Sequence, residues 1–305
     1  MWRAPAAATL LLALVASGCA VRGDERRAAP DPRRYGSSPA SAAPDDSPVQ
    51  LGPRGGDGPT VRIPGGSTGA SGSRGSASTT VDDFGRLGSN THLYLSNEVP
   101  KLVVEVDAVR GYEPSAGALS MLRSRLEAVT DKPAGIEMLP ISTFAGGRSS
   151  WTENDVMDVQ RRQRDRWSNR DEIVLYVLYV DGSFADDEKS LGVSFNSSMY
   201  TIFIEQIRGA AATPLVSAEA IERAVTVHEM GHVLALVNLG YRSPRNHEDP
   251  SHPGHSNNGD SVMYWAVDNV GVASLVGGRT GPPTQFDADD LADLEDLRRG
   301  RLRVE

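Results

Sequence analysis

Cysteine is almost absent from this sequence, which has a single one, Cys19, among 305 residues. A disulfide bond within the chain is therefore excluded. Basic residues are also in the minority, because 31 lysines and arginines stand against 40 aspartates and glutamates, a formal net charge of -9. We expect no nucleic-acid partner for so acidic a chain. The densest basic stretch, residues 161–164, is interpreted as the solvated face of a helix.

Long hydrophobic runs are missing as well. The apolar run over residues 6–16 is too short to span a membrane, which takes about 20 residues. It follows a weakly basic start and precedes small residues and Cys19, as in a secretory signal peptide. The segment Ala16–Cys19 resembles a bacterial lipobox, although that pattern prefers Leu or Val where Ala16 stands.

The lipobox resemblance implies a signal peptide over residues 1–18 and a lipid on Cys19, the mature N-terminus. Such an anchor attaches a protein to a membrane without a spanning segment. We therefore expect an exported, membrane-anchored lipoprotein that faces the periplasm or the cell exterior. The alternative is an ordinary signal peptide followed by an unrelated cysteine.

Aromatic residues are scarce in the next part of the chain. Residues 20–90 consist largely of Gly, Ser, Pro, Ala, Asp and Arg, with two aromatic residues, Tyr35 and Phe84. Such a segment cannot bury enough apolar surface to offset its ordering entropy. The sequence predicts a disordered tether over residues 19–90 and a folded domain over residues 91–305.

The folded part shows alternating strand and helix patterns. The stretch 173–180 is apolar throughout, which predicts a central strand of a sheet. The order β-α-β-α-β-β-β-α-loop-α predicts an α+β or α/β fold, in which a mixed, mostly parallel sheet packs on helices. Strands are predicted at 102–106, 136–139, 173–180, 191–195 and 200–205, helices at 115–129, 152–167, 217–239 and 287–299, and a loop at 241–261.

A cluster of chemically active residues lies inside the helix predicted over 217–239. His228 and His232 are four residues apart, so they project from one face of a helix. That spacing lets two imidazoles bind one Zn²⁺. Glu229 then lies beside the metal-bound water and can take its proton. The surrounding residues are apolar on more than one face, so the helix is buried and its polar groups need partners. The alternative is a pair of hydrogen-bonded core histidines.

The segment His228–His232 resembles the metzincin superfamily of zinc peptidases, whose motif HExxHxxGxxH precedes a turn that carries methionine. Met263 looks like that methionine. The sequence departs from the motif at Ala235, where the family has glycine, and at Asn238, where it has the third histidine. The glycine lets the chain leave the helix sharply. Without it, we expect the helix to run on to Gly240 and the third ligand to come from further along.

The stretch His255–Met263 resembles the archaemetzincin branch of that superfamily. There the third histidine and a cysteine precede a second cysteine and the turn methionine at this spacing, and Ser256 and Ser261 stand where the cysteines would be. The resemblance implies His255 as third ligand, residues 238–254 as an insertion, one catalytic Zn²⁺, a zincin-like fold and a peptide or protein substrate. The alternatives as ligand are His252, His247 and Asp249, and we expect His247 and His252 to be solvent-exposed.

Further candidates lie close to this motif. The phenol of Tyr264 or Tyr241 is a possible oxyanion stabiliser, with simple packing as the alternative for each. Acidic residues open the last helix, and we interpret them as favourable to the helix dipole. Two functions follow from the sequence: a zinc peptidase with Glu229 as general base, or a non-catalytic zinc-binding lipoprotein of the same fold.

Overall fold

The computed structural model describes residues 81–211, 216–269 and 281–305. The predicted signal peptide, the lipidation site Cys19 and tether residues 19–80 lie outside this part. Within it, no helix combines the length and apolarity that crossing a membrane requires. The fold begins before Thr91, the predicted start, because Asp83 and Asn90 are already buried.

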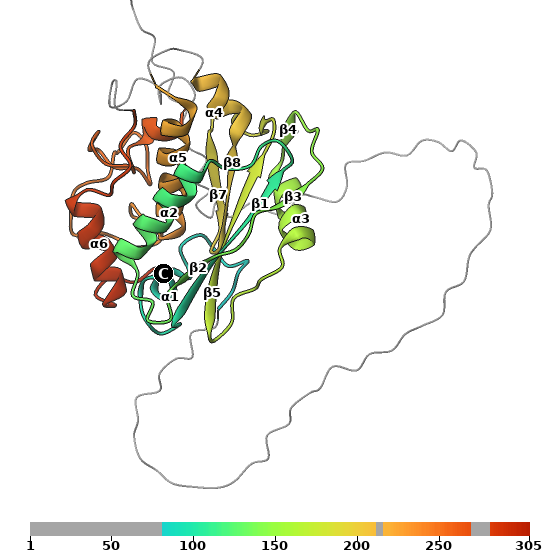
Figure 1. Cartoon of the computed structure of the whole chain (residues 1–305). Coiled ribbons are helices and arrows are strands. Elements are labelled where there is room, and N and C mark those ends of the chain that lie inside the picture. The colour runs from blue at the N-terminus through green and yellow to red at the C-terminus, as the bar shows by residue number, and fades with distance from the viewer. Residues whose placement is uncertain (1–80, 212–215, 270–280) are drawn as a thin grey trace, which may run out of the picture. The chain divides into compact units, whose positions relative to one another are not determined.

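The helices and strands follow one another along the chain as Figure 1 shows. They are α1 (Thr91–Leu95), β1 (Lys101–Val109), α2 (Ala116–Val129), β2 (Ile136–Met138), β3 (Ser142–Phe144), β4 (Ser150–Trp151), α3 (Glu153–Gln163), β5 (Glu172–Val180), β6 (Ser183–Phe184), β7 (Gly192–Asn196), β8 (Met199–Phe203), α4 (Ile204–Ala210), α5 (Ala218–Val233), the 3₁₀ helix η1 (Trp265–Asp268) and α6 (Ala288–Arg298).

The main sheet has the strand order β2-β1-β5-β8-β7, with β3 also paired to β1. Its pairs are parallel except for β7 and β8, which are antiparallel. The predicted strand at 173–180 is β5 and lies between β1 and β8, buried along nearly its whole length. The predicted mixed, mostly parallel sheet packed on helices is confirmed.

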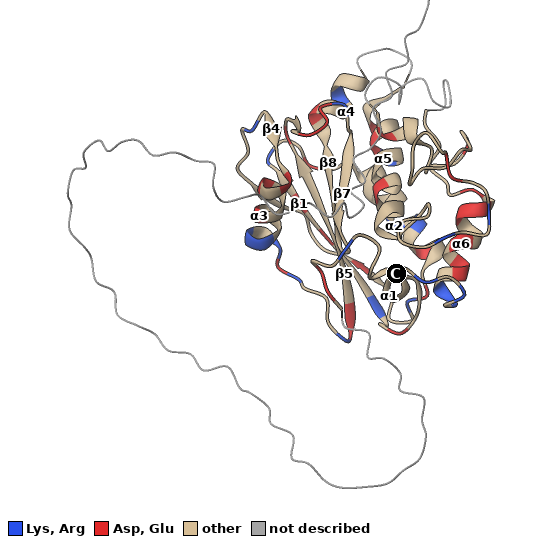
Figure 2. Ribbon diagram, turned by 180° about the vertical axis from the view of Figure 1, so that it is seen from behind, with Lys and Arg blue, Asp and Glu red and all other residues tan. Residues whose placement is uncertain are grey.

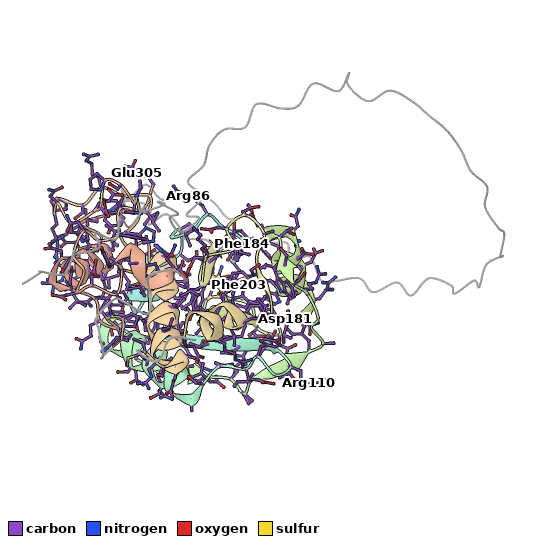
Figure 3. All side chains as sticks on the ribbon, turned by 90° about the horizontal axis from the view of Figure 1, so that it is seen from above. Arg86, Arg110, Asp181, Phe184, Phe203 and Glu305 are labelled. Atoms are coloured by element: carbon purple, nitrogen blue, oxygen red, sulfur yellow. The ribbon has the colours of Figure 1, made fainter. Side chains whose placement is uncertain are left out.

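Helices cover both faces of this sheet. Figure 1 shows α2 and α5 on one side of the strands and α3 on the other. Alternate residues of β5 face the two layers: Leu175 belongs to the apolar cluster under α5, and Tyr176 to the smaller cluster under α3. In that smaller cluster, the ring centroids of Phe184 and Phe203 are 6.1 Å apart. Both residues are labelled in Figure 3.

Several predicted boundaries were wrong by a few residues. Helix α3 ends at Gln163 rather than residue 167, and β8 ends at Phe203, where helix α4 begins unpredicted. Short elements such as α1 and β3 also escaped prediction, because three to five residues carry too little periodicity to be recognised.

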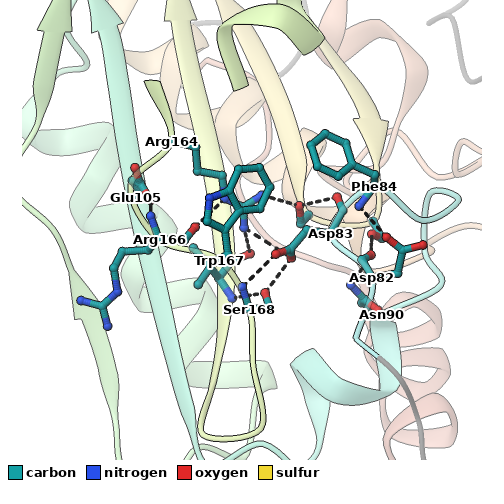
Figure 4. Close-up of polar contacts among 12 residues, drawn as sticks. Asp82, Asp83, Phe84, Asn90, Glu105, Arg164, Arg166, Trp167 and Ser168 are labelled. Atoms are coloured by element: carbon teal, nitrogen blue, oxygen red, sulfur yellow. Dashed lines mark hydrogen bonds and ion pairs between the residues drawn. The ribbon is translucent and has the colours of Figure 1, made fainter. Parts of the chain in front are cut away.

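The interpretation of residues 161–164 as a solvated face was wrong for Arg164. Its guanidinium is fully buried, donates to Ser198 Oγ at 2.8 Å and lies 3.4 Å from Asp83. It also stacks 4.5 Å above the ring of Trp167, as Figure 4 shows. The chain turns inward where α3 ends, so Arg164 joins Asp83, near the end of the range predicted as tether, to Ser198 beside the sheet.

Candidate metal centre

Helix α5 carries the motif and lies in the interior. Its N-cap Ser217 accepts a hydrogen bond from the N–H of Ala220 at 3.2 Å, and Glu219 stands in the first turn, where a carboxylate favours the helix dipole. Every residue from Ala224 to Val233 is buried. The helix contacts α2 on one side and β7 and β8 of the sheet on the other.

The helix does not run on to Gly240, so that prediction was wrong. It ends at Val233, and Ala235 takes the left-handed conformation with φ of 64°. Alanine does this at a cost of about 1–2 kcal/mol, which full burial of the neighbouring Leu236 and Val237 offsets. The chain therefore turns out of the helix at the position where the resembled family uses glycine.

Three histidine side chains meet below this turn. Nε2 of His232 lies 3.1 Å from Nε2 of His228, and the ligand nitrogens of both lie within 4.8 Å of one on His255. The ring centroids of His228 and His255 are 5.2 Å apart. All three side chains are at most 1% exposed. Nitrogens this close without solvent repel one another unless a proton or a cation lies between them.

Backbone carbonyls orient two of these rings. Nδ1 of His228 lies 2.7 Å from the oxygen of Val262, and Nδ1 of His255 lies 3.3 Å from that of Pro253. Because a carbonyl only accepts, each Nδ1 carries the hydrogen and each Nε2 keeps its lone pair for a ligand. Nε2 of His255 is buried and has no hydrogen-bond partner among the described residues.

The electrostatics keep these histidines neutral. Burial lowers the pKa of His228 to about 3 and that of His255 to about 4. Burial, followed by the neighbouring His228 and His255, holds the pKa of His232 well below its usual value. A metal ion binds only deprotonated imidazole. The residues therefore fit a divalent cation, because the imidazoles are neutral at neutral pH and at least one nitrogen lacks another partner.

A short hairpin brings His255 to the helix. Its strands meet through Asp249 N–H to His255 O and Asn257 N–H to His247 O, each at 2.8 Å. Glu248 attaches the hairpin to the segment that follows α5, since it accepts a hydrogen bond from Asn238 Nδ2 at 2.7 Å. It also accepts one from the Gly254 N–H at 3.0 Å.

Asn238, which replaces the third histidine of the resembled motif, thus helps to hold the loop that supplies His255. It adopts a φ of 61°, a left-handed conformation in which asparagine is enriched. Its Oδ1 also accepts from the Ser243 N–H at 2.7 Å.

The alternative ligands are occupied elsewhere. The ring of His252 stacks on Trp265 with centroids 4.2 Å apart, and its Nδ1 bonds to Asp249 at 2.8 Å. His247 is 2% exposed and lies against α6. The expectation that His247 and His252 are solvent-exposed was therefore wrong, although neither joins the group formed by the three other histidines.

His247 belongs to a buried ionic network that links the hairpin to α6. Its Nε2 lies 3.0 Å from Asp293 and its Nδ1 lies 3.4 Å from Asp290. Arg245 contacts Asp293 at 2.5 Å. Burial opposes protonation of His247, but the two carboxylates outweigh it and raise the pKa to about 10. With His247 protonated, two cations balance two buried carboxylates.

The acidic start of α6 has the structural role that the sequence predicted. Asp287 caps the helix by accepting the N–H groups of Asp289 and Asp290, each at 2.9 Å, and Figure 2 shows further acidic residues along α6. Carboxylate oxygens of Asp287 and Asp290 also lie within 4.8 Å of a nitrogen of His247. Because Asp287 is engaged as a cap and the network is charge-balanced, we interpret this group as an ion-pair network.

Glu229 lies beside the three histidines and faces the sheet edge. Its Oε2 accepts from Ser194 Oγ on β7 at 2.8 Å, while Oε1 is buried without a hydrogen-bond partner within residues 81–211, 216–269 and 281–305. Burial, followed by the charge of Asp268, holds the pKa of Glu229 well above its usual value. Gly192 allows the close approach of β7, because a Cβ there would lie 2.6 Å from Cγ of Glu229.

Met263 lies directly under the helix. A Cβ at Gly231 would overlap its Sδ, so the methionine packs against the backbone between the two helix histidines. Tyr241 donates its hydroxyl to Asp293 at 2.9 Å, which favours a structural role for it. Tyr264 is half-buried and its ring lies 5.9 Å from that of Trp265.

Two residues near Glu229 were not predicted from the sequence. Ser194 and Asp268 lie 35 residues before and 39 residues after Glu229 in the chain. A carboxylate oxygen of Asp268 lies within 4.8 Å of ligand atoms of both His228 and Glu229. No local pattern marks either residue, since serine and aspartate are common in loops and strand ends.

Comparison with known proteins finds distant likeness at the level of structure. No protein-family description matches this chain, and no curated protein matches it. Among solved structures, it is similar to archaemetzincin from Methanopyrus kandleri, with 11% identity and a TM-score of 0.44 over 68% of this chain and 97% of that one. A likeness at this level carries no conclusion about what this chain does.

Proposed function

We propose that this chain is a zinc-dependent peptidase with His228, His232 and His255 as metal ligands and Glu229 as general base. One observation carries the proposal: three buried imidazoles converge, and next to one of them, His228, lies the carboxylate of Glu229, whose Oε1 has no hydrogen-bond partner in the described part of the chain. Three neutral nitrogen ligands are the donor set of catalytic zinc sites, which leave a fourth position open.

Each residue has a defined role in this proposal. A zinc ion held by the three histidines would polarise the peptide carbonyl and acidify a water molecule. Oε1 of Glu229 takes the proton of the attacking water and delivers it to the leaving amine. Ser194 donates to Oε2 at 2.8 Å and so fixes the orientation of the carboxylate next to His228. The raised pKa of Glu229, caused by burial, makes it a stronger base than an exposed carboxylate.

The alternative is a non-catalytic zinc-binding protein with the same fold. The observation that favours it is burial, because the three histidines and Glu229 are each at most 1% exposed, and a purely structural zinc site is closed to solvent. A structural site, however, has no use for a buried carboxylate beside the metal.

Metal content and peptide cleavage by the full chain separate the two functions. We expect one equivalent of zinc, hydrolysis of a mixed peptide library, and loss of hydrolysis with retained zinc in Glu229→Gln. Bound zinc without turnover by the wild-type chain or by any variant described below would favour the non-catalytic alternative.

The third ligand is tested separately with matched histidine variants. His255→Ala should lose most of the bound zinc, because two imidazoles alone hold the ion weakly. His252→Ala, on the same loop but outside the three-histidine group, should keep it. Stoichiometric zinc in His255→Ala would refute the assignment.

We also propose that Cys19 carries a lipid that anchors the exported chain to a membrane. The proposal rests on the sequence from residue 16 to residue 19. Incorporation of labelled palmitate into the chain, abolished in Cys19→Ser, is the expected result. Export without any label would favour an ordinary signal peptide.

A further inference from the structure

Asp268 ends η1, the short helix that follows Met263, and reaches the candidate metal centre. It is 2% exposed. One of its carboxylate oxygens lies within 4.8 Å of ligand atoms of His228 and Glu229. The roles proposed above for the histidines and the general base leave this carboxylate without a function.

The same carboxylate is bound to the edge of the sheet. Its Oδ1 accepts the N–H of Gly192 at 2.6 Å and that of Leu191 at 2.9 Å. The contact extends along the backbone, because Leu191 N–H lies 3.4 Å from the carbonyl of Asp268 and Ser190 forms an antiparallel bridge with Asn269. Residues 268–269 therefore pair with residues 190–192, where β7 begins.

This stretch of β7 is the one that lies against the general base. Gly192 approaches Glu229 so closely that a Cβ would be 2.6 Å from Cγ and 2.9 Å from Oε1. β7 is also the last strand in the order of the main sheet. An exposed strand edge binds an extended peptide through its backbone N–H and C=O groups. A peptide held there would lie beside Glu229, with a carbonyl oxygen where Oδ1 of Asp268 now lies.

We propose that residues 268–269 occupy the place of a peptide substrate, with Asp268 as the group that holds them on β7. The structure is then a closed, latent form. This inference rests on the proposed peptidase function. It explains why the three histidines and Glu229 are at most 1% exposed although a peptidase must admit its substrate.

The test compares Asp268→Ala and Asp268→Asn with the wild-type full chain. Alanine removes the acceptor of both N–H groups, so the open form becomes more populated and kcat/KM should rise by about tenfold or more, in proportion to the open fraction. Asparagine keeps an oxygen acceptor and should give an intermediate rise. Asp260→Ala, at an exposed loop position, is the matched control and should leave kcat/KM unchanged.

A second readout needs neither metal nor turnover. In chelator-treated protein, the amides of Leu191 and Gly192 should exchange with solvent faster in Asp268→Ala than in the wild type. The three buried histidines should react more readily with diethyl pyrocarbonate. The asparagine variant serves if the alanine variant does not fold, as judged by its circular dichroism.

The outcomes separate this inference from the proposed function. Faster exchange and higher histidine reactivity without peptide cleavage by any variant would support the closed form and reject the peptidase. A fall in kcat/KM with unchanged zinc content would overturn the inference, because Asp268 would then assist the reaction. Unchanged amide exchange in both variants would overturn it as well.

Discussion

Replacing Asp293 with alanine should weaken both the fold and the metal centre. Asp293 is fully buried and lies on α6, where it joins that helix to the loop that carries His255. It accepts hydrogen bonds from four side chains at 2.5 to 3.0 Å, those of Tyr241, Ser243, Arg245 and His247.

The magnitude follows from what the substitution leaves behind. Removing one partner of a buried ion pair costs about 3–5 kcal/mol, because the other charge stays buried. In the variant, Arg245 would still pair with Asp296 at 2.8 Å, and its side chain is 25% exposed to solvent. Its charge is therefore not left fully buried, and we expect a cost in the lower half of this range. Each kcal/mol lowers the melting temperature of a domain of this size by about 2–4 °C, so a cost of about 3–4 kcal/mol predicts a decrease of about 6–16 °C.

The assay is thermal unfolding of the full chain together with zinc affinity from chelator competition. Zinc affinity should also fall, because the hairpin that supplies His255 loses its attachment to α6. Asp289→Ala, an exposed position in the first turn of α6, should cost less than about 1 kcal/mol. The reasoning is refuted if the melting temperatures of the two variants agree within about 2 °C.

Two further predictions concern stability. Gly231→Ala should destabilise the fold by about 1–3 kcal/mol through overlap with Met263. Gly209→Ala, whose new Cβ has no atom of the described residues within 4 Å, should instead stabilise α4 by about 0.5 kcal/mol. Equal effects of the two substitutions in urea unfolding would contradict this. Because the pKa of His247 is raised from 6.5 to about 10 on folding, its stabilising contribution is complete below about pH 6.5 and is lost as the pH rises through about 10. Unfolding measured between pH 7 and pH 10 should show that loss in the wild type and a smaller one in His247→Gln.

The sequence predicted those features that depend on short spacing. The four-residue interval between His228 and His232 places both on one face of any helix. The helix starts at residues 217 and 287 were also predicted, and Ser217 and Asp287 each cap a helix through contacts local to a few residues. The uninterrupted apolar run of β5 likewise predicted a strand buried on both faces, which its position between β1 and β8 confirms.

Loop geometry was harder to predict, for a physical reason. Ala235 takes a left-handed conformation that its own preference disfavours, and only the burial of its neighbours makes it acceptable. The polar loop around His247 predicts an exposed side chain. His247 is nevertheless buried, because it pairs with two carboxylates of α6 that lie more than 40 residues later in the chain. Such contacts depend on distant parts of the chain, which no local pattern records.

The sequence by itself determined the helix, its two histidines and the glutamate between them, because helical periodicity fixes which side chains share a face. It left several loop residues as alternatives for the third position, and only resemblance favoured His255. The tertiary structure decided that the ring of His255, on a hairpin tied to α6, joins the other two. It also brought Ser194 and Asp268 to Glu229, since contacts between distant segments arise only when the chain packs.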